Sequence, residues 1–268
     1  ENYFFVSYKN ILDTNIFIFL LLFFIFGLYD DKLGINSNLK LFLSIIFFLL
    51  FILFNQNFIL KEIITTTGYK LSLGHMAIPF TVFCLVIFQN ALNMFDGINL
   101  QNILYFCFLI IIIYFFYNKI EFFIYLIPVL ILTIFMNSKN YLFLGDSGSY
   151  LLSFIIAITL IDTFNNNNNI FSDEVFLFLC IPGYDLLRLA ILRIYKKKHP
   201  FKGDRQHIHH MLISKIGYLK AIVYLNLLCF LPIIFSLISN QQVVAIIISL
   251  ALYMFTIYYF RNDKSNQK

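Results

Sequence analysis

Long apolar runs separated by short polar segments dominate this chain. Nine apolar segments can be drawn, near residues 14–29, 39–54, 76–92, 102–118, 121–136, 148–163, 173–191, 217–238 and 242–260. A segment of about 17 or more nearly uncharged residues is long enough to cross the hydrocarbon core of a bilayer as a helix. The pattern therefore predicts an all-α fold, a polytopic bundle of about nine transmembrane helices.

The composition supports this prediction. Of 268 residues, 60% are hydrophobic, 12% are charged and 35 are Phe, whereas about 25% of the residues in an average soluble domain are charged. The polar segments are too short for a sizeable soluble domain. We therefore expect a single integral membrane domain over residues 1–268, with membrane lipid and no nucleic acid as a partner.

The distribution of positive charge predicts which side of the membrane each polar segment occupies. If every apolar segment crosses the bilayer, one side receives residues 30–38, 93–101, 137–147, 192–216 and the tail from 261. Fifteen of the 19 Lys and Arg residues lie on this side or within a turn of it, against four on the other. Because positively charged loops stay in the cytoplasm, we expect this side to be cytoplasmic and the first residues to lie outside.

Acidic residues gather at the predicted cytoplasmic ends of the apolar segments. Asp30 and Asp31 follow the first segment, Asp96 follows the third, Asp146 precedes the sixth and Asp185 lies near the end of the seventh. Each has a simple structural explanation as a helix stop, a turn residue or a helix cap. Paired carboxylates nevertheless repel unless a cation or a proton separates them. A few carboxylates completed by waters and substrate phosphates are how proteins bind Mg²⁺, so the pattern indicates a metal–phosphate site.

The densest polar stretch is residues 201–211, Phe-Lys-Gly-Asp-Arg-Gln-His-Ile-His-His-Met. Its histidines do not follow the i, i+4 spacing of a helical zinc site, although a zinc or nickel site stays an alternative. Arg205 and Lys202 beside them favour a cationic pocket for phosphate. The run of three lysines at 196–198 is more typical of contact with anionic lipid headgroups.

Four motifs stand in order along the predicted cytoplasmic face. They are Gly-Leu-Tyr-Asp-Asp at 27–31 with Lys40 downstream, Asn-Met-Phe-Asp-Gly-Ile at 93–98, Phe-Leu-Gly-Asp-Ser-Gly-Ser at 143–149, and Pro-Phe-Lys-Gly-Asp-Arg-Gln-His-Ile-His-His at 200–210. Together they resemble the polyprenyl-phosphate N-acetylhexosamine-1-phosphate transferase superfamily, glycosyltransferase family 4. The His-Ile-His-His form is similar to the undecaprenyl-phosphate GlcNAc-1-phosphate transferase branch. The peptidoglycan branch, phospho-MurNAc-pentapeptide transferase, usually carries three consecutive histidines there and is the second alternative.

The resemblance implies an enzyme of the bacterial inner (plasma) membrane with its active site on the cytoplasmic face. It would transfer a sugar-1-phosphate from a UDP-N-acetylhexosamine to undecaprenyl (polyprenyl) phosphate and release UMP. The cofactor would be Mg²⁺, with Mn²⁺ as an alternative. The product would initiate a lipid-linked cell-surface glycan, such as O-antigen lipopolysaccharide or another cell-wall polymer. A homodimer is an open alternative for the oligomeric state.

The resemblance also implies roles for individual residues. Asp30 would deprotonate or orient the lipid phosphate, with Asp31 beside it, and Asp146 would bind the magnesium ion. Asp96, a third catalytic candidate, and Asn93 would hold the nucleotide or the metal shell. The expected substrate-binding residues are Lys40 for a phosphate, Asn93 and Asn99, and, for the diphosphate or the sugar, Arg205, His207, His209 and His210.

Three departures from the family pattern set expectations of their own. Asn99 and Leu100 stand where a second acid and a Gly are common, and Ser44 stands where Gln is common. Family members also have about two further spans before the Asp-Asp motif, so we expect either a fragment or a short member. Outside the family, a cation or proton transporter is the main alternative, but it should spread its acids across the depth of the membrane. A purely structural membrane protein would not explain four polar motifs on one face.

Overall fold

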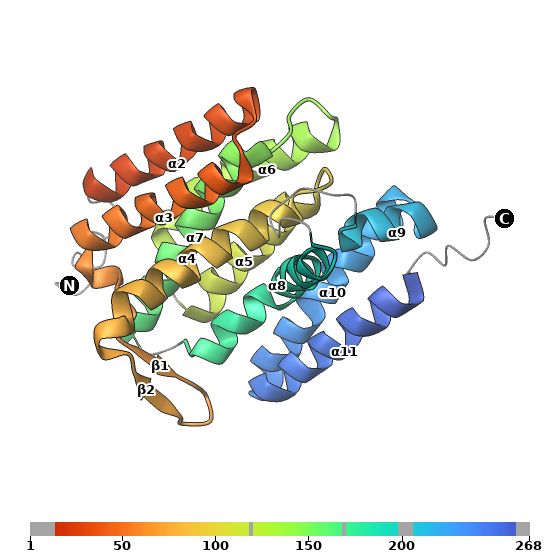
Figure 1. Cartoon of the computed structure of the whole chain (residues 1–268). Coiled ribbons are helices and arrows are strands. Elements are labelled where there is room, and N and C mark those ends of the chain that lie inside the picture. The colour runs from red at the N-terminus through yellow and green to blue at the C-terminus, as the bar shows by residue number, and fades with distance from the viewer. Residues whose placement is uncertain (1–13, 118–119, 168–169, 198–205, 261–268) are drawn as a thin grey trace.

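The computed structural model describes residues 14–117, 120–167, 170–197 and 206–260 (Figure 1). Its helices are α2 (Thr14–Leu33), α3 (Ser37–Phe54), α4 (Ala77–Phe95), α5 (Gln101–Tyr117), α6 (Ile120–Ser138), α7 (Gly145–Asn167), α8 (Ser172–Tyr195), α9 (Ile208–Ile216), α10 (Tyr218–Ser239) and α11 (Gln242–Phe260). Two short 3₁₀ turns, Gln56–Phe58 and Gly74–Met76, flank a hairpin of β1 (Glu62–Ile64) and β2 (Lys70–Ser72).

The helices confirm the all-α membrane bundle. Among the described residues, each of the nine apolar segments coincides with one helix. The remaining helix, α9, lies in a segment that the sequence pattern marks as polar. Six of these helices, α3, α4, α7, α8, α10 and α11, are long and apolar enough to cross a membrane. Helix α5 and residues 126–138 of α6 are apolar but shorter. The chain is therefore a multi-pass membrane protein, and the count of nine spans stays a prediction.

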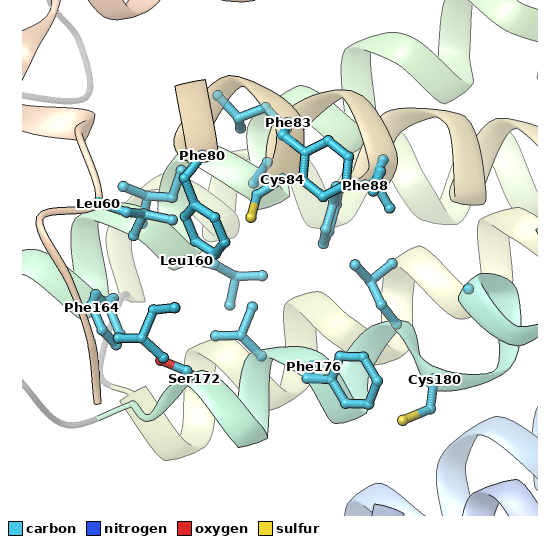
Figure 2. Close-up of a pocket in the computed structure, with 18 of the residues that line it drawn as sticks. Leu60, Phe80, Phe83, Cys84, Phe88, Leu160, Phe164, Ser172, Phe176 and Cys180 are labelled. Atoms are coloured by element: carbon cyan, nitrogen blue, oxygen red, sulfur yellow. The ribbon is translucent and has the colours of Figure 1, made fainter. Parts of the chain in front are cut away.

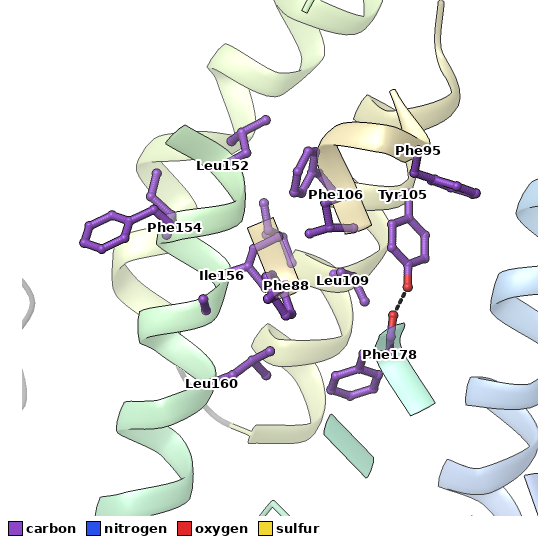
Figure 3. Close-up of a cluster of buried hydrophobic side chains, with 14 of the residues drawn as sticks. Phe88, Phe95, Tyr105, Phe106, Leu109, Leu152, Phe154, Ile156, Leu160 and Phe178 are labelled. Atoms are coloured by element: carbon purple, nitrogen blue, oxygen red, sulfur yellow. Dashed lines mark hydrogen bonds between the residues drawn. The ribbon is translucent and has the colours of Figure 1, made fainter. Parts of the chain in front are cut away.

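Helix α7 forms the centre of the bundle. Of the residues in its most apolar stretch, 89% are buried inside the protein, compared with 22% for α3. It packs against α2, α4 and α5, and Figure 3 shows its side chains, among them Leu152 and Ile156, facing those of α4 and α5. Because α7 begins at Gly145, the first turn of the most buried helix carries the motif around Asp146.

Aromatic side chains fill much of the core around α7. Phe154 packs against Phe23 of α2 and Phe51 of α3, with ring centroids 4.9 and 5.0 Å apart. On the other side, the Tyr105 hydroxyl of α5 donates to the backbone carbonyl of Phe178 in α8 (Figure 3). Offset and edge-to-face ring contacts add to the burial of apolar area, so this Phe-rich sequence holds α2, α3, α5 and α8 around α7.

Two elements lie in segments that the sequence pattern assigned to polar connections. The β1–β2 hairpin pairs Glu62 with Ser72, and the backbone N–H of Thr66 at its turn donates to Asp173 at the start of α8. Helix α9 begins inside the histidine segment, residues 207–210, so that His207 precedes the helix and His209 and His210 lie in its first turn. Figure 1 shows the hairpin and α9 at opposite ends of the bundle.

Candidate active site

The turn between α2 and α3 brings Lys40 next to Asp30. Gly34 has a φ of +67°, a left-handed conformation that glycine adopts without strain. The turn is held by Asp30, whose Oδ1 accepts a hydrogen bond of 2.8 Å from the backbone N–H of Ile35. Helix α3 then runs back along α2, and Lys40, in its first turn, forms an ion pair with Oδ2 of Asp30.

A very close approach of α2 to α7 adds the third acidic motif. A Cβ atom on Gly27 would lie only 2.3 Å from the Cα of Ser147, so only glycine permits this contact. As a result, Asp31 lies at the N-terminus of α7. Its Oδ1 accepts from the backbone N–H of Asp146 at 2.8 Å, and its Oδ2 accepts from that of Ser147 at 3.1 Å. Asp31 therefore caps α7 and fixes the position of Asp146.

Asp146 joins the three motifs into one cluster. Its Oδ2 lies 2.7 Å from Nζ of Lys40, and its Oδ1 accepts a hydrogen bond of 2.7 Å from the side-chain amide of Asn93. The Lys40 ammonium thus bridges Asp30 and Asp146, and it neutralises two carboxylates that would otherwise repel each other. Lys40 and Asp146 are far apart in sequence, and only the fold brings them together.

Asp96 lies at the end of α4, beside this cluster. Its Oδ2 accepts from the Ser149 hydroxyl at 3.1 Å, and Ser149 in turn accepts from the side-chain amide of Asn102 at 3.0 Å. Burial raises the pKa of Asp96 to about 7, and the negative charges of Asp146 and Asp31 contribute to the rise. A carboxyl group that changes protonation near neutral pH is suited to proton transfer.

The histidine segment contacts the acidic cluster through Gly97. A Cβ atom on Gly97 would lie 1.9 Å from Nε2 of His209, so the imidazole occupies the space next to Asp96. The ring of His209 stacks on that of His207, with centroids 5.3 Å apart, and contacts that of His210 at 4.3 Å. Burial, together with the neighbouring His210 and His207, lowers the pKa of His209 to about 3. His209 is therefore a neutral ring at physiological pH, which can donate or accept one hydrogen bond but adds no positive charge.

One predicted substrate-binding residue, Asn99, lies apart from this constellation. The Asn99 side chain donates to that of Asn140 at 2.6 Å, and its carbonyl accepts from the Tyr218 hydroxyl at 2.9 Å. These contacts join the segment before α5 to the end of α6 and the start of α10, so in this structure Asn99 supports the fold. Arg205 lies outside the described residues.

Asp185 makes more contacts than the sequence suggested. From the sequence it is only an acid near the predicted membrane boundary, with no assigned role. In the structure it accepts a hydrogen bond from His207 at 2.9 Å and one from Arg188 at 2.7 Å. Its position among apolar residues of α8 was the available signal, because a buried carboxylate needs partners.

The chemistry of the acidic residues suits a divalent cation. Asp30 and Asp146 offer the oxygen ligands that Mg²⁺ prefers, and a single ammonium group now balances their two charges. Across the part of the chain that the structure describes, no group of three or more His, Cys, Asp or Glu side chains is arranged to hold a metal. The predicted role of Asp146 as a metal ligand therefore stays a proposal, and Lys40 would have to turn away for both carboxylates to bind one ion.

An apolar cavity of about 410 Å³ lies elsewhere, between α4, α7, α8 and the hairpin. Figure 2 shows Phe80, Phe83, Phe164 and Phe176 around it. It follows the half of α4 that begins near the hairpin, whereas Asn93 and Asp96 lie at the other end of that helix. Its walls can hold a hydrocarbon group but offer little for reaction chemistry, so the polar cluster is the candidate active site.

Fold and cluster together define a multi-pass helical membrane protein with carboxylates, an ammonium group and imidazoles collected at one end. Comparison with known families agrees with this class. The chain belongs to glycosyl transferase family 4, whose family model matches residues 14–164, more than half of the chain. The resemblance drawn from the four motifs is thereby confirmed.

Several curated relatives share one name, undecaprenyl-phosphate alpha-N-acetylglucosaminyl 1-phosphate transferase. The protein from Escherichia coli K12 is 25% identical over 216 residues, covering 72% of this chain and 55% of that protein. The one from Yersinia pestis is 36% identical over 95 residues, 35% of this chain and 26% of its own length. The one from Thermotoga maritima is 34% identical over 83 residues, 31% of this chain and 27% of its own. The chain thus spans about half the length of the curated relatives it matches over the longest stretch.

Proposed function

We propose that this protein transfers an N-acetylhexosamine-1-phosphate from a UDP-sugar to undecaprenyl (polyprenyl) phosphate and releases UMP. The observation that carries the proposal is the cluster of Asp30, Lys40, Asp96 and Asp146 at the ends of membrane helices, in contact with a buried histidine segment. The names of the relatives support the same reaction.

The reaction balances without an oxidant or a reductant. An oxygen of the lipid phosphate attacks the phosphorus that carries the sugar, the bond from that phosphorus to the oxygen of UMP breaks, and UMP leaves. Both substrates are anionic, so catalysis depends mainly on positioning and on neutralising charge on the phosphoryl oxygens. A lipid substrate arrives within the bilayer and a nucleotide arrives from water, which requires a site at the membrane boundary.

The residues of the cluster divide this work. Lys40 supplies a positive charge for a phosphate oxygen. Asp30, which forms an ion pair with Lys40, orients that phosphate. Asp96 accepts the proton of the attacking phosphate, because its pKa of about 7 is close to that of a phosphate monoester. His207, His209 and His210 contact the nucleotide diphosphate or the sugar. Mg²⁺, or alternatively Mn²⁺, held by Asp146 and Asp30, would neutralise charge on the diphosphate.

The arrangement of the acids favours an enzyme over a transporter. A pathway for cations or protons would distribute its acids through the depth of the membrane. Here Asp30 and Asp96 lie at the ends of their helices and Asp146 lies at the start of its own, all within one cluster. With the positive charge on the same side, we place the site at the cytoplasmic face of a bacterial inner membrane.

The test is a transfer assay with a panel of donors. Purified full-length protein in detergent or vesicles receives undecaprenyl phosphate, Mg²⁺ and labelled UDP-GlcNAc, other UDP-N-acetylhexosamines or UDP-MurNAc-pentapeptide. We expect a labelled lipid with a UDP-N-acetylhexosamine, and loss of the product when EDTA removes the metal. Labelling only with the pentapeptide donor would move the protein to the peptidoglycan branch. A folded protein that labels no lipid with any donor is not this transferase.

A further inference from the structure

Asp185 is a buried carboxylate at the meeting point of three helices. Only 3% of its surface is exposed. Its Oδ1 accepts from Arg188 at 2.7 Å and from the Tyr253 hydroxyl at 3.0 Å, and its Oδ2 lies 2.9 Å from Nδ1 of His207. A buried charge is costly unless it is paired and its lone pairs are filled. Donors from α8, α11 and the start of α9 together meet that requirement.

Arg188 ties the same carboxylate to the histidine segment and to α11. One guanidinium nitrogen donates both to Asp185 and, at 2.7 Å, to the backbone carbonyl of Gln206, the residue before His207. Its Nε donates to the Tyr253 hydroxyl at 2.8 Å. Tyr253 is 2% exposed and packs in the interface where α11 lies against α8. The Arg188 guanidinium therefore holds the backbone at Gln206 directly, and it holds the His207 side chain indirectly through Asp185, just before α9.

On its other side, His207 faces the acidic cluster. Its ring is parallel to that of His209, within 6°, and His209 lies against Gly97 beside Asp96. Contacts therefore run without a break from Tyr253 on the last helix to Gly97 at the site.

We propose that Asp185, Arg188 and Tyr253 are positioning residues that hold His207 in the orientation needed to bind the nucleotide diphosphate. A hydrogen on Nδ1 donated to Asp185 fixes the ring and leaves Nε2 for the substrate, as carboxylate partners do for other functional histidines. The inference rests on the transferase function proposed above. It gives α11 a part in the reaction, although this helix lies outside residues 14–164, where the family model matches.

The first test removes one hydroxyl group with Tyr253→Phe. The KM for the UDP-sugar should rise about tenfold, equivalent to about 1.4 kcal/mol. The KM for polyprenyl phosphate should stay the same, because Lys40, which we assign to a phosphate of that substrate, makes none of the contacts around Asp185. Tyr258→Phe is the matched control on the same helix, since Tyr258 is 83% exposed, and it should change neither KM. A fall in kcat with both KM values unchanged would indicate only a loss of folded protein and would overturn the proposal.

A double-mutant cycle shows whether Tyr253 acts through His207. In a His207→Ala background, adding Tyr253→Phe should raise the KM for the UDP-sugar no further, because the group that it positions is already gone. If the two effects multiply instead, Tyr253 acts by another route and the inference is wrong. Asp185→Asn should behave like Tyr253→Phe in the same cycle.

Hydrogen exchange separates a failure of this inference from a failure of the proposed function. Backbone amides of residues 206–216 should exchange faster in Tyr253→Phe than in wild type or Tyr258→Phe, whatever the protein catalyses. Wild-type protein without transfer activity but with this exchange difference would contradict the transferase and leave the positioning contact standing. Equal exchange in all three proteins would overturn the positioning role itself.

Discussion

Asp146 is the residue on which the acidic motifs converge. It contacts Lys40 and Asn93 through its carboxylate and Asp31 through its backbone N–H. Asp146→Asn keeps the shape of the side chain but removes the charge opposite Lys40. We expect turnover to fall by about a hundredfold or more, as when a key charge-stabilising group is lost. Initial rates of labelled-lipid formation measure this.

Glu62→Gln is the control for that substitution. Glu62 forms a 2.7 Å ion pair with Lys70 in the hairpin, at the opposite end of the bundle from α9 and the cluster (Figure 1). The substitution removes one carboxylate charge, as Asp146→Asn does, and should leave turnover unchanged. Near-wild-type turnover in Asp146→Asn would remove Asp146 from the site.

Substitutions of His209 and of Gly97 should affect turnover alike, because the His209 ring occupies the space that a side chain on residue 97 would need. His209→Ala should lower turnover by about a hundredfold, comparable to the loss of one transition-state donor. Gly97→Ala should cause a similar loss, because its Cβ would fall 1.9 Å from Nε2 of His209 and displace the ring. The measurement is the turnover rate of each variant. Full activity in Gly97→Ala would show that the position of the His209 ring does not limit the reaction.

The pKa of Asp96 predicts how stability depends on pH. Its pKa is about 7 in the folded protein and 3.8 in an unfolded chain. The folded state therefore binds more protons between these values, and the stabilisation present below pH 3.8 is lost as the pH rises through 7. Each pKa unit corresponds to about 1.4 kcal/mol. With EDTA present, Asp96→Asn should remove this loss, so its melting temperature relative to wild type should rise from pH 5 to pH 8. Parallel pH profiles for the two proteins would contradict this assignment.

At the residue scale, the sequence located the acidic motifs but did not show how their side chains are paired. The motifs around Asp30, Asp96 and Asp146 were identified correctly as lying at one end of the bundle. The capping of α7 by Asp31 depends on the contact of Gly27 with Ser147, and no local pattern shows that. The partnership of Asp185 with His207 depends likewise on how α8 and α9 pack.

Among the elements, α2 and α7 control the geometry of the site through one glycine. Gly27→Ala would place a Cβ 2.3 Å from the Cα of Ser147, and backbone atoms cannot yield as a flexible side chain does. The helices would have to separate, which moves Asp31 away from the N-terminus of α7. We expect a lower melting temperature in detergent and a loss of transfer activity of at least about tenfold, since overpacking typically costs about 1–3 kcal/mol.

Gly183→Ala is the matched control in α8. A Cβ on Gly183 meets no atom within 4 Å, and alanine is favoured over glycine inside a helix by about 1 kcal/mol. This variant should melt at the wild-type temperature or above and retain its activity. If Gly27→Ala and Gly183→Ala have the same melting temperature and activity, the contact between α2 and α7 does not determine the geometry of the site.

The elements that sequence patterns missed share a physical reason. Helix α9 has nine residues and follows a polar segment, so its local signal was too short to separate from a connection. The hairpin has strands of three residues and is stabilised by the contact of Thr66 with Asp173 rather than by a strand pattern. Long apolar helices, by contrast, are set by the local sequence, and all nine predicted segments coincide with helices among the described residues.

At the scale of the whole molecule, the two ends of the bundle carry different chemistry. One end holds the acidic cluster and the histidine segment, and the other holds the hairpin. In the topology predicted from the sequence, fifteen of the 19 Lys and Arg residues lie on the same side as the acidic motifs or within a turn of it. Because positively charged segments remain in the cytoplasm, the hairpin should face outward and the site inward.

Cysteine labelling in intact cells tests this orientation. The native cysteines at 84, 107, 180 and 229 are free thiols and would first be replaced by alanine. Thr67→Cys in the exposed hairpin turn should then react with a membrane-impermeant maleimide, whereas Lys139→Cys, exposed after α6, should react only once the membrane is permeabilised. The opposite result would put the acidic cluster outside the cell, where UDP-sugars made in the cytoplasm do not reach it. The labelling therefore checks, independently of any activity assay, whether the site can meet its proposed nucleotide substrate.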